Sequence, residues 1–224
     1  NFGFKTKSYQ NICWFLSFGN QFSQNMRKAF SMLVGAEVFS KDLPIGYQIA
    51  TSIYPSALSI ESNATGVSFY NPTAAKDLSI SELNRYEHKK FPADIKYLFY
   101  DNGKIKNVVT SIVGHWQSNL SAFVNIESVT DSDLLSDELL KHTYPISLFP
   151  IKADSACINE YFDKFGVSYN GVDSTTLQTE ILKSNHLMPI MFEDTVIAYS
   201  PSLETVVFEF GNGYIEFAFI VKKE

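Results

Sequence analysis

A run of large apolar residues constrains the fold of this chain more than any other feature of the sequence. Over residues 13–34 such side chains recur in steps of three or four, at Phe15, Phe18, Phe22, Met26, Phe30 and Leu33. This period is typical of an amphipathic helix. Gln10 and Asn11 before the run and Gly35 after it are typical of helix ends. The sequence therefore predicts a helix over residues 13–34, with Cys13 in its first turn.

A cysteine in the first turn of a helix can act as a nucleophile. The unpaired backbone N–H groups and the positive end of the helix dipole stabilise a thiolate, which is the form that attacks a carbonyl. The alternative is a buried Cys13 that packs as a small apolar residue between Trp14 and Phe15. The second thiol, Cys157, is expected to face the core on another amphipathic helix.

The segment around Cys13 resembles the nucleophile segment of papain-like cysteine proteases. Its residues are Asn11-Ile12-Cys13-Trp14, with the small polar Ser17 four places after the cysteine. The viral members are similar here (aphthovirus leader, coronavirus papain-like and alphavirus non-structural proteases), as are ubiquitin-specific and OTU deubiquitinases. The resemblance implies that Cys13 is the nucleophile and that Asn11 donates to the oxyanion, with Gln10 as an alternative donor. Helix capping explains Asn11 equally well.

Such enzymes also need a histidine base, and the chain has four histidines. Three of them are expected at helix ends or in a loop: His88, His142 and His186. His115 differs, because it follows a β-prone run at residues 108–113 and lies in Gly114-His115-Trp116, which resembles the Gly-His-aromatic segment of the same families. With the turn at Asn102-Gly103, the sequence predicts a β-hairpin of residues 95–100 and 105–116 that carries His115 at a sheet rim.

The residue that orients the histidine has three candidates. Asp131 follows His115 at the distance at which papain-like enzymes carry an Asn or Asp, although helix capping also explains it. Gln117 stands where OTU-type enzymes carry an Asp or Asn, and Asn125 lies on the next expected strand. Asp131 is the first choice, and the three stay open.

The other signals predict an α+β fold. Further strands are expected at 46–53, 67–70, 122–128, 144–149 (as an edge strand) and in a meander at 189–192, 195–200, 205–210 and 214–222. Further helices are expected at 79–88, 132–141, 154–166 and 174–184. The resemblance implies a papain-like two-lobed arrangement, with the nucleophile helix packed on an antiparallel sheet. We expect a helix-rich lobe at 1–90 and a β-rich lobe at 91–224, or one compact domain.

Composition limits the partners. The net charge of −6 and the pI near 5.3 argue against nucleic acid, since phosphate binding needs a basic surface. The sequence has no apolar run near the roughly 18 residues of a membrane span. Its two cysteines are far apart, which suits a reducing compartment and predicts a cytoplasmic protein. Neither a zinc-binding spacing nor a phosphate-binding glycine loop occurs, so no cofactor is expected.

The sequence thus predicts a cysteine protease, either viral and polyprotein-processing or deubiquitinating, that uses a Cys13/His115 dyad. Its substrate would be a peptide or protein, with ubiquitin-like tails among the candidates. The alternative is a non-catalytic protein-binding or structural module, with a protease-like or unrelated α+β fold. The two hypotheses differ at Cys13, which the enzyme needs exposed in a cleft and the module buries.

Overall fold

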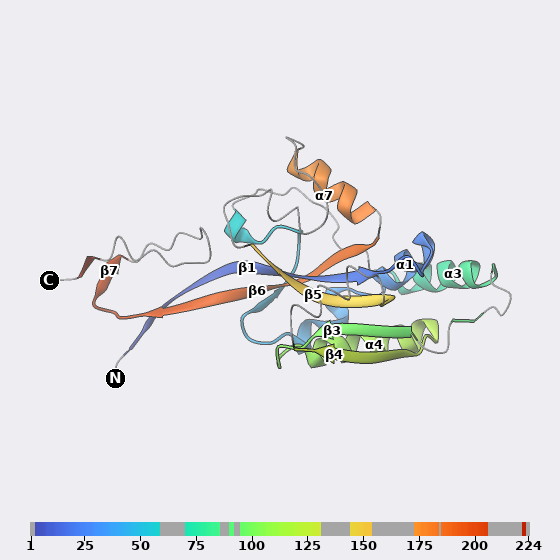
Figure 1. Ribbon diagram of the computed structural model, residues 1–224, viewed down its shortest axis with the longest axis horizontal. Coiled ribbons are helices and arrows are strands. Elements are labelled where there is room, and N and C mark those ends of the chain that lie inside the picture. Colours follow the sequence, from blue (N-terminus) through green and yellow to red (C-terminus); the bar gives the residue numbers. More distant parts are fainter. Residues whose placement is uncertain are drawn as a thin grey trace.

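A six-stranded sheet forms the centre of the protein (Figure 1). The computed structural model describes residues 3–58, 70–85, 90–91, 95–130, 144–153, 173–183, 185–205 and 221–222. The strand order is β2-β6-β1-β5-β3-β4. The strands are β1 (Lys5–Phe18), β2 (Tyr47–Ile49), β3 (Ile95–Tyr100), β4 (Val124–Val129), β5 (Ile146–Lys152) and β6 (Leu187–Tyr199). A separate pair joins β7 (Leu203–Thr205) to β8 (Val221–Lys222).

The sheet is mixed rather than antiparallel. Strands β2, β6, β1 and β5 pair antiparallel, whereas β5, β3 and β4 pair parallel. Parallel neighbours need a crossover connection, and helix α4 (Lys106–Leu120) supplies it between β3 and β4. The expected papain-like arrangement on an antiparallel sheet is therefore wrong. The sheet takes strands from both sides of residue 90, and the division into lobes at 1–90 and 91–224 stays a prediction.

The central strand β1 replaces the start of the expected helix, residues 13–18. Its residues from Cys13 to Leu16 are fully buried, because both faces of the sheet are covered. Such a strand is a continuous apolar run without clear alternation, so its period cannot be told from that of a buried helix. Helix α1 (Gln24–Ser31) begins only after Ser23, whose Oγ accepts a hydrogen bond from the Met26 backbone N–H at 3.1 Å. The predicted helix over 13–34 is thus a strand, a turn and a shorter helix.

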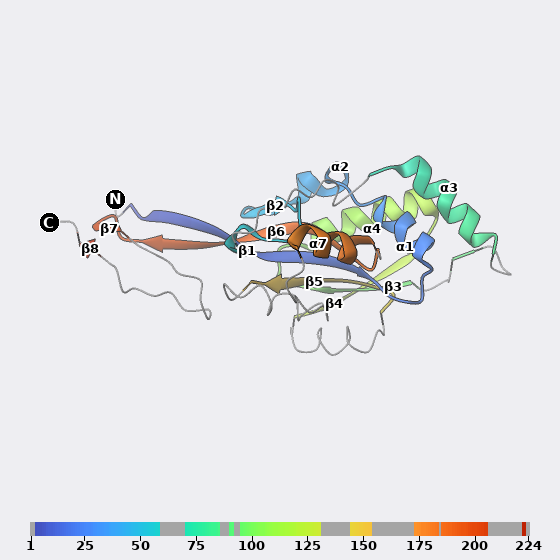
Figure 2. The same ribbon diagram turned by 90° about the horizontal axis from the view of Figure 1, so that it is seen from above.

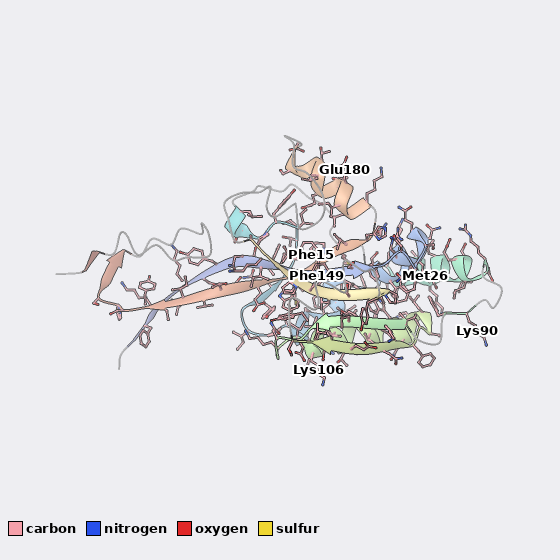
Figure 3. All side chains as sticks on the ribbon, in the orientation of Figure 1. Phe15, Met26, Lys90, Lys106, Phe149 and Glu180 are labelled. Carbon is pink, nitrogen blue, oxygen red and sulfur yellow. The ribbon has the colours of Figure 1, made fainter. Side chains whose placement is uncertain are left out.

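Helices cover one face of the sheet over the main core (Figure 2). They are α1, α2 (Ala36–Phe39), α3 (Pro72–Leu83) and α4, with 3₁₀ turns η1 (Ser40–Asp42) and η2 (Ser56–Leu58). Trp14 and Leu16 of β1 point into this core. Cys13 and Phe15 point to the opposite face, where they pack with residues of α7 (Ser174–Lys183). On that face Phe15 lies next to Phe149 of β5, with ring centroids 6.5 Å apart (Figure 3).

Residues 105–116 form most of a helix rather than the second strand of a hairpin. Ile105, Val108, Val109, Ile112 and Trp116 are all fully buried, and their spacing of three and four is that of one helix face. Packing of that face against the sheet outweighs the β propensity of the valines, which is a weak preference that depends on context. The sheet-rim position predicted for His115 is therefore wrong.

The other expected elements had mixed outcomes. The strand at 95–100, the strand near 122–128 and the helix near 174–184 are confirmed as β3, β4 and α7. The strand expected at the edge, 144–149, is instead β5, which lies inside the sheet. The two strands expected at 189–200 are one long strand, β6. The helix expected at 79–88 is α3, which begins earlier, at Pro72. Asn71 Oδ1 caps it there by accepting a hydrogen bond from the Ala74 backbone N–H at 2.9 Å.

Several predictions lie wholly or largely outside the described residues. They are the strand at 67–70, the helices at 132–141 and 154–166, and the meander beyond residue 205. Within the described part of the chain, no helix combines the length and apolar character needed to cross a lipid bilayer.

Candidate functional site

The structure does not bring the predicted catalytic residues together. Cys13 lies in the middle of β1, fully buried, on the face that packs with α7. His115 lies on α4, which packs on the opposite face of the same sheet. A nucleophile and its base must be within hydrogen-bonding reach of each other. Because the sheet separates Cys13 from His115, the two do not form a dyad.

The other predicted site residues that the structure describes do not gather around Cys13 either. Asn11 is 1% exposed, and its Oδ1 accepts a hydrogen bond from Thr195 Oγ1 at 2.7 Å. His115 Nε2 lies 3.0 Å from Tyr70 Oη, and partial burial lowers the pKa of this histidine. Asn125 and Gln117 are exposed, on β4 and α4. The first choice for the orienting residue, Asp131, lies outside the described residues.

A different group of side chains forms the candidate site. We call it the carboxyl-edge cluster, and its members are Trp14, Tyr47, Tyr100, Asn102, Lys104 and Glu193. β3 and β5 run parallel, so their carboxyl ends lie at the same edge of the sheet. Tyr100 ends β3, and the loop to α4 carries Asn102 and Lys104. In open α/β sheets, ligands bind outside the carboxyl ends of the strands.

Glu193 is the centre of the cluster. Its Oε2 accepts a hydrogen bond from Trp14 Nε1 at 2.9 Å, and its Oε1 lies 3.8 Å from Lys104 Nζ. Tyr47 stands directly opposite Glu193 in the β2–β6 register, which places both side chains on one face. Burial, together with the adjacent Glu193 carboxylate, raises the pKa of the Tyr47 hydroxyl. Tyr47 therefore stays a neutral phenol beside the carboxylate.

The loop after β3 is held in one conformation by its own side chains. Asp101 Oδ1 accepts from the Gly103 backbone N–H at 2.8 Å, and Asn102 Oδ1 accepts from the Lys104 backbone N–H at 3.1 Å. Gly103 has a φ of +78°, a conformation that glycine adopts without steric cost. Asn102 Nδ2 then donates to Tyr47 Oη at 2.6 Å. The polar part of the site is thus preformed.

Aromatic rings surround this polar centre. The Trp14 ring lies 6.4 Å from that of Tyr47 and 6.1 Å from that of Tyr100, measured between centroids. Trp14 is fully buried, whereas Tyr100, Asn102 and Lys104 are partly or largely exposed. An apolar wall with a few fixed polar groups is the usual composition of a small-ligand site. The described residues contain no group of three or more His, Cys, Asp or Glu side chains placed to hold a metal ion.

The sequence does not indicate this site, because its residues come from four separate segments. The one signal available was the Asn102-Gly103 turn, which we expected within a β-hairpin. It instead connects a strand to a helix, at the edge where parallel strands end. Nothing in the sequence near Trp14, Tyr47 or Glu193 indicates that these residues meet.

Comparison with known proteins gives a fold but no close relative. No family model and no curated protein matches the chain. Solved structures do match. The pheromone receptor PrgZ superposes with a TM-score of 0.69 at 14% identity, over 99% of this chain and 50% of PrgZ. The unliganded open form of the periplasmic murein tripeptide-binding protein MppA gives 0.68 at 13% identity, over 93% and 47%. NikA from Staphylococcus aureus, in complex with Ni(L-His)₂, gives 0.68 at 13% identity, over 99% and 54%.

These matches correct the functional prediction. The matched fold is that of substrate-binding proteins rather than of papain-like cysteine peptidases, so the protease and deubiquitinase hypothesis is wrong. The expectation of a ubiquitin-like substrate falls with it. The burial of Cys13 agrees, since it is what the non-catalytic alternative requires. The chain spans about half the length of the proteins it matches. It therefore has the fold of about half of such a binding protein. Of the two hypotheses drawn from the sequence, the non-catalytic binding module fits this fold better than the protease.

Proposed function

We propose that this chain forms a ligand-binding part of a solute-binding protein that delivers peptides to an ABC transporter. The observation that carries the proposal is the fold match over 99% of the chain to a receptor described by its mode of peptide binding. MppA, matched over 93% of the chain, is described as binding a murein tripeptide. An oligopeptide transporter's substrate-binding domain from Bacillus anthracis also matches, with a TM-score of 0.68.

The carboxyl-edge cluster supports a peptide as the ligand. A peptide presents amide groups that need hydrogen-bond partners and side chains that need apolar surface. The cluster offers the amide of Asn102, the carboxylate of Glu193 and the ring of Tyr100 at one edge of the sheet. Because the loop that carries Asn102 is preformed, little conformational entropy is lost when a ligand binds.

A metal complex is the less favoured ligand. NikA is described with Ni(L-His)₂, so the fold does not exclude such a ligand. The described part of this chain, however, lacks a cluster of metal-ligating side chains. A bare nickel ion would therefore find no ligand set among the described residues, and the binding test with nickel and histidine decides about the complex.

Peptide binding is tested most directly by thermal stability and calorimetry on the purified chain. A ligand that binds only the folded state stabilises it by RT ln(1 + [L]/Kd), which is about 2.7 kcal/mol at one hundred times Kd. We expect a saturable rise in Tm with defined tripeptides to nonapeptides and a matching calorimetric isotherm. No shift with any peptide, or a shift with nickel and histidine instead, would contradict the proposal.

Two variants locate the binding. Tyr100→Ala removes part of the aromatic wall and should weaken peptide binding by about tenfold to a hundredfold, since burying an aromatic ring contributes on the order of 1.5–3 kcal/mol. Glu180→Ala is the control, because Glu180 is an exposed residue of α7 (Figure 3), which packs on the face of the sheet opposite to Trp14. Equal effects of the two substitutions would place the ligand elsewhere. The cytoplasmic location expected from the two distant cysteines stays a prediction, and it differs from the periplasmic location of MppA. Cell fractionation distinguishes the two.

A further inference from the structure

The ammonium group of Lys104 forms a long ion pair with the carboxylate of Glu193. The Lys104 Nζ to Glu193 Oε1 distance is 3.8 Å, longer than the usual charge-assisted hydrogen bond of about 2.7–2.9 Å. The two side chains also differ in exposure, at 57% for Lys104 and 16% for Glu193. The same Nζ lies 5.8 Å from the centroid of the Tyr47 ring. A largely exposed cation thus faces a carboxylate that accepts a hydrogen bond from Trp14.

The Glu193 carboxylate is held on its core side by Trp14. Trp14 Nε1 donates to Oε2 from a fully buried ring, and Tyr47, at 7% exposure, forms the adjacent wall. A carboxylate that is mostly removed from water is stabilised by a nearby cation. An ion pair with an exposed lysine contributes only about 0–1 kcal/mol. Moving Lys104 into water therefore costs little, provided that another cation takes its position.

We propose that Glu193 and the ring of Tyr47 form a subsite for the side-chain ammonium of a lysine in a bound peptide, and that Lys104 occupies this subsite when no ligand is present. The inference deepens the proposed function and rests on it. It predicts which peptides the carboxyl-edge cluster prefers, and it makes Lys104 an internal competitor.

The shape of the site favours a lysine side chain over the amino terminus of a peptide. Lys104 reaches Glu193 on a flexible four-carbon stem, so the position is already accessible to an ammonium group on such a stem. An amino-terminal ammonium is attached directly to the peptide backbone and lacks such a stem, so the backbone itself would have to come close to Glu193. The cation–π contact with Tyr47 adds about 0.5–1 kcal/mol for either ammonium.

The test compares four peptides on the unmodified chain by calorimetry. They are Ala-Lys-Ala, the same peptide with norleucine in place of lysine, Ala-Lys-Ala acetylated at its amino terminus, and Ala-Lys-Ala acetylated on the lysine side chain. The free-lysine peptides should bind about three- to tenfold more tightly than the norleucine peptide. Acetylation of the side chain should remove this preference, and acetylation of the amino terminus should leave it.

Two substitutions then identify the residues. Glu193→Gln should bring the ratio of lysine to norleucine affinity close to one. Lys104→Gln should raise that ratio, because the competitor is gone. Lys104 is exposed, so this second variant tests the inference even if Glu193→Gln fails to fold.

The outcomes separate the two proposals. If none of the peptides binds, the proposed function fails. If the peptides bind with equal affinity, or if acetylation of the amino terminus removes the preference, peptide binding stands and the lysine subsite is wrong. An unchanged ratio in Lys104→Gln would likewise overturn the inference.

Discussion

Trp14 Nε1 donates a hydrogen bond to Glu193 Oε2 at 2.9 Å, and this bond joins the central strand β1 to its neighbour β6. In the register, Glu193 pairs with Ile12, so its side chain reaches diagonally across the sheet to Trp14. The donor comes from a fully buried ring, and the acceptor belongs to a partly exposed side chain. The pair thus connects the core to the carboxyl-edge cluster.

Loss of this bond should lower the stability of the protein. Trp14→Phe keeps an aromatic ring but removes the donor, and hydrogen bonds to charged groups contribute about 1.5–3 kcal/mol. We expect the free energy of unfolding in urea to fall by at least that amount, since the smaller ring also leaves space. A double-mutant cycle with Glu193→Ala, which removes the acceptor, isolates the bond. Strictly additive losses in the cycle would show that the bond contributes nothing.

Glu82 should make stability depend on pH. This glutamate is 2% exposed, and its oxygens accept from Ser23 Oγ at 2.7 Å and Asn25 Nδ2 at 2.8 Å, which ties α3 to the start of α1. The hydrogen bond from Asn25, then that from Ser23, lowers the pKa of the carboxyl below its ordinary value. The lowered pKa in the folded state means that this stabilisation is complete above the unfolded pKa and is lost as the pH falls through the folded one.

The measurement compares unmodified protein with Glu82→Gln in urea between pH 3 and pH 7. The variant should be less stable at neutral pH, and the difference should shrink on acidification because Glu82 then becomes neutral as well. Glu180→Gln, on the exposed surface of α7, is the control and should follow the unmodified protein. A difference that stays constant over the whole range would contradict the role of the charge.

Two glycines should respond in opposite ways to alanine. A Cβ on Gly35 would lie 2.8 Å from Tyr70 Cβ, which is closer than such atoms approach, so Gly35→Ala should cost about 1–3 kcal/mol. A Cβ on Gly114 meets nothing within 4 Å, and Gly114 is an exposed position inside α4. Gly114→Ala should therefore stabilise by roughly 0.5–1 kcal/mol. Thermal unfolding of both variants checks the signs, and a neutral Gly35→Ala would show that Tyr70 moves freely.

Cys13 should be unreactive in the folded protein. Its side chain is fully buried in the sheet, and a thiol must be accessible as a thiolate to react. In a Cys157→Ser background we expect iodoacetamide to modify Cys13 only as fast as the protein unfolds, at every pH. Addition of His115→Ala should not change the pH profile of the reaction. A reactive thiol below about pH 6 that depends on His115 would revive the dyad.

Local sequence determined those elements whose signals agreed with their surroundings. The strand at β3, the strand at β4 and the capped helix α7 were predictable, because propensity, apolar pattern and burial all favour the same structure. At Cys13 the alternative is confirmed, a buried residue between Trp14 and Phe15, whereas the main prediction of an accessible nucleophile is wrong.

Tertiary structure decided the rest. Residues 13–18 and 105–116 both contain apolar, β-prone side chains, yet one segment is the central strand and the other is most of a crossover helix. Tertiary contacts decide between strand and helix. Strand β1 forms hydrogen bonds with two neighbouring strands, whereas α4 packs one apolar face on the sheet and connects two parallel strands. The candidate site follows from the same pairing. Trp14, Asn102 and Glu193 meet only because β1, β3 and β6 lie in one sheet, and no local pattern encodes that order of strands.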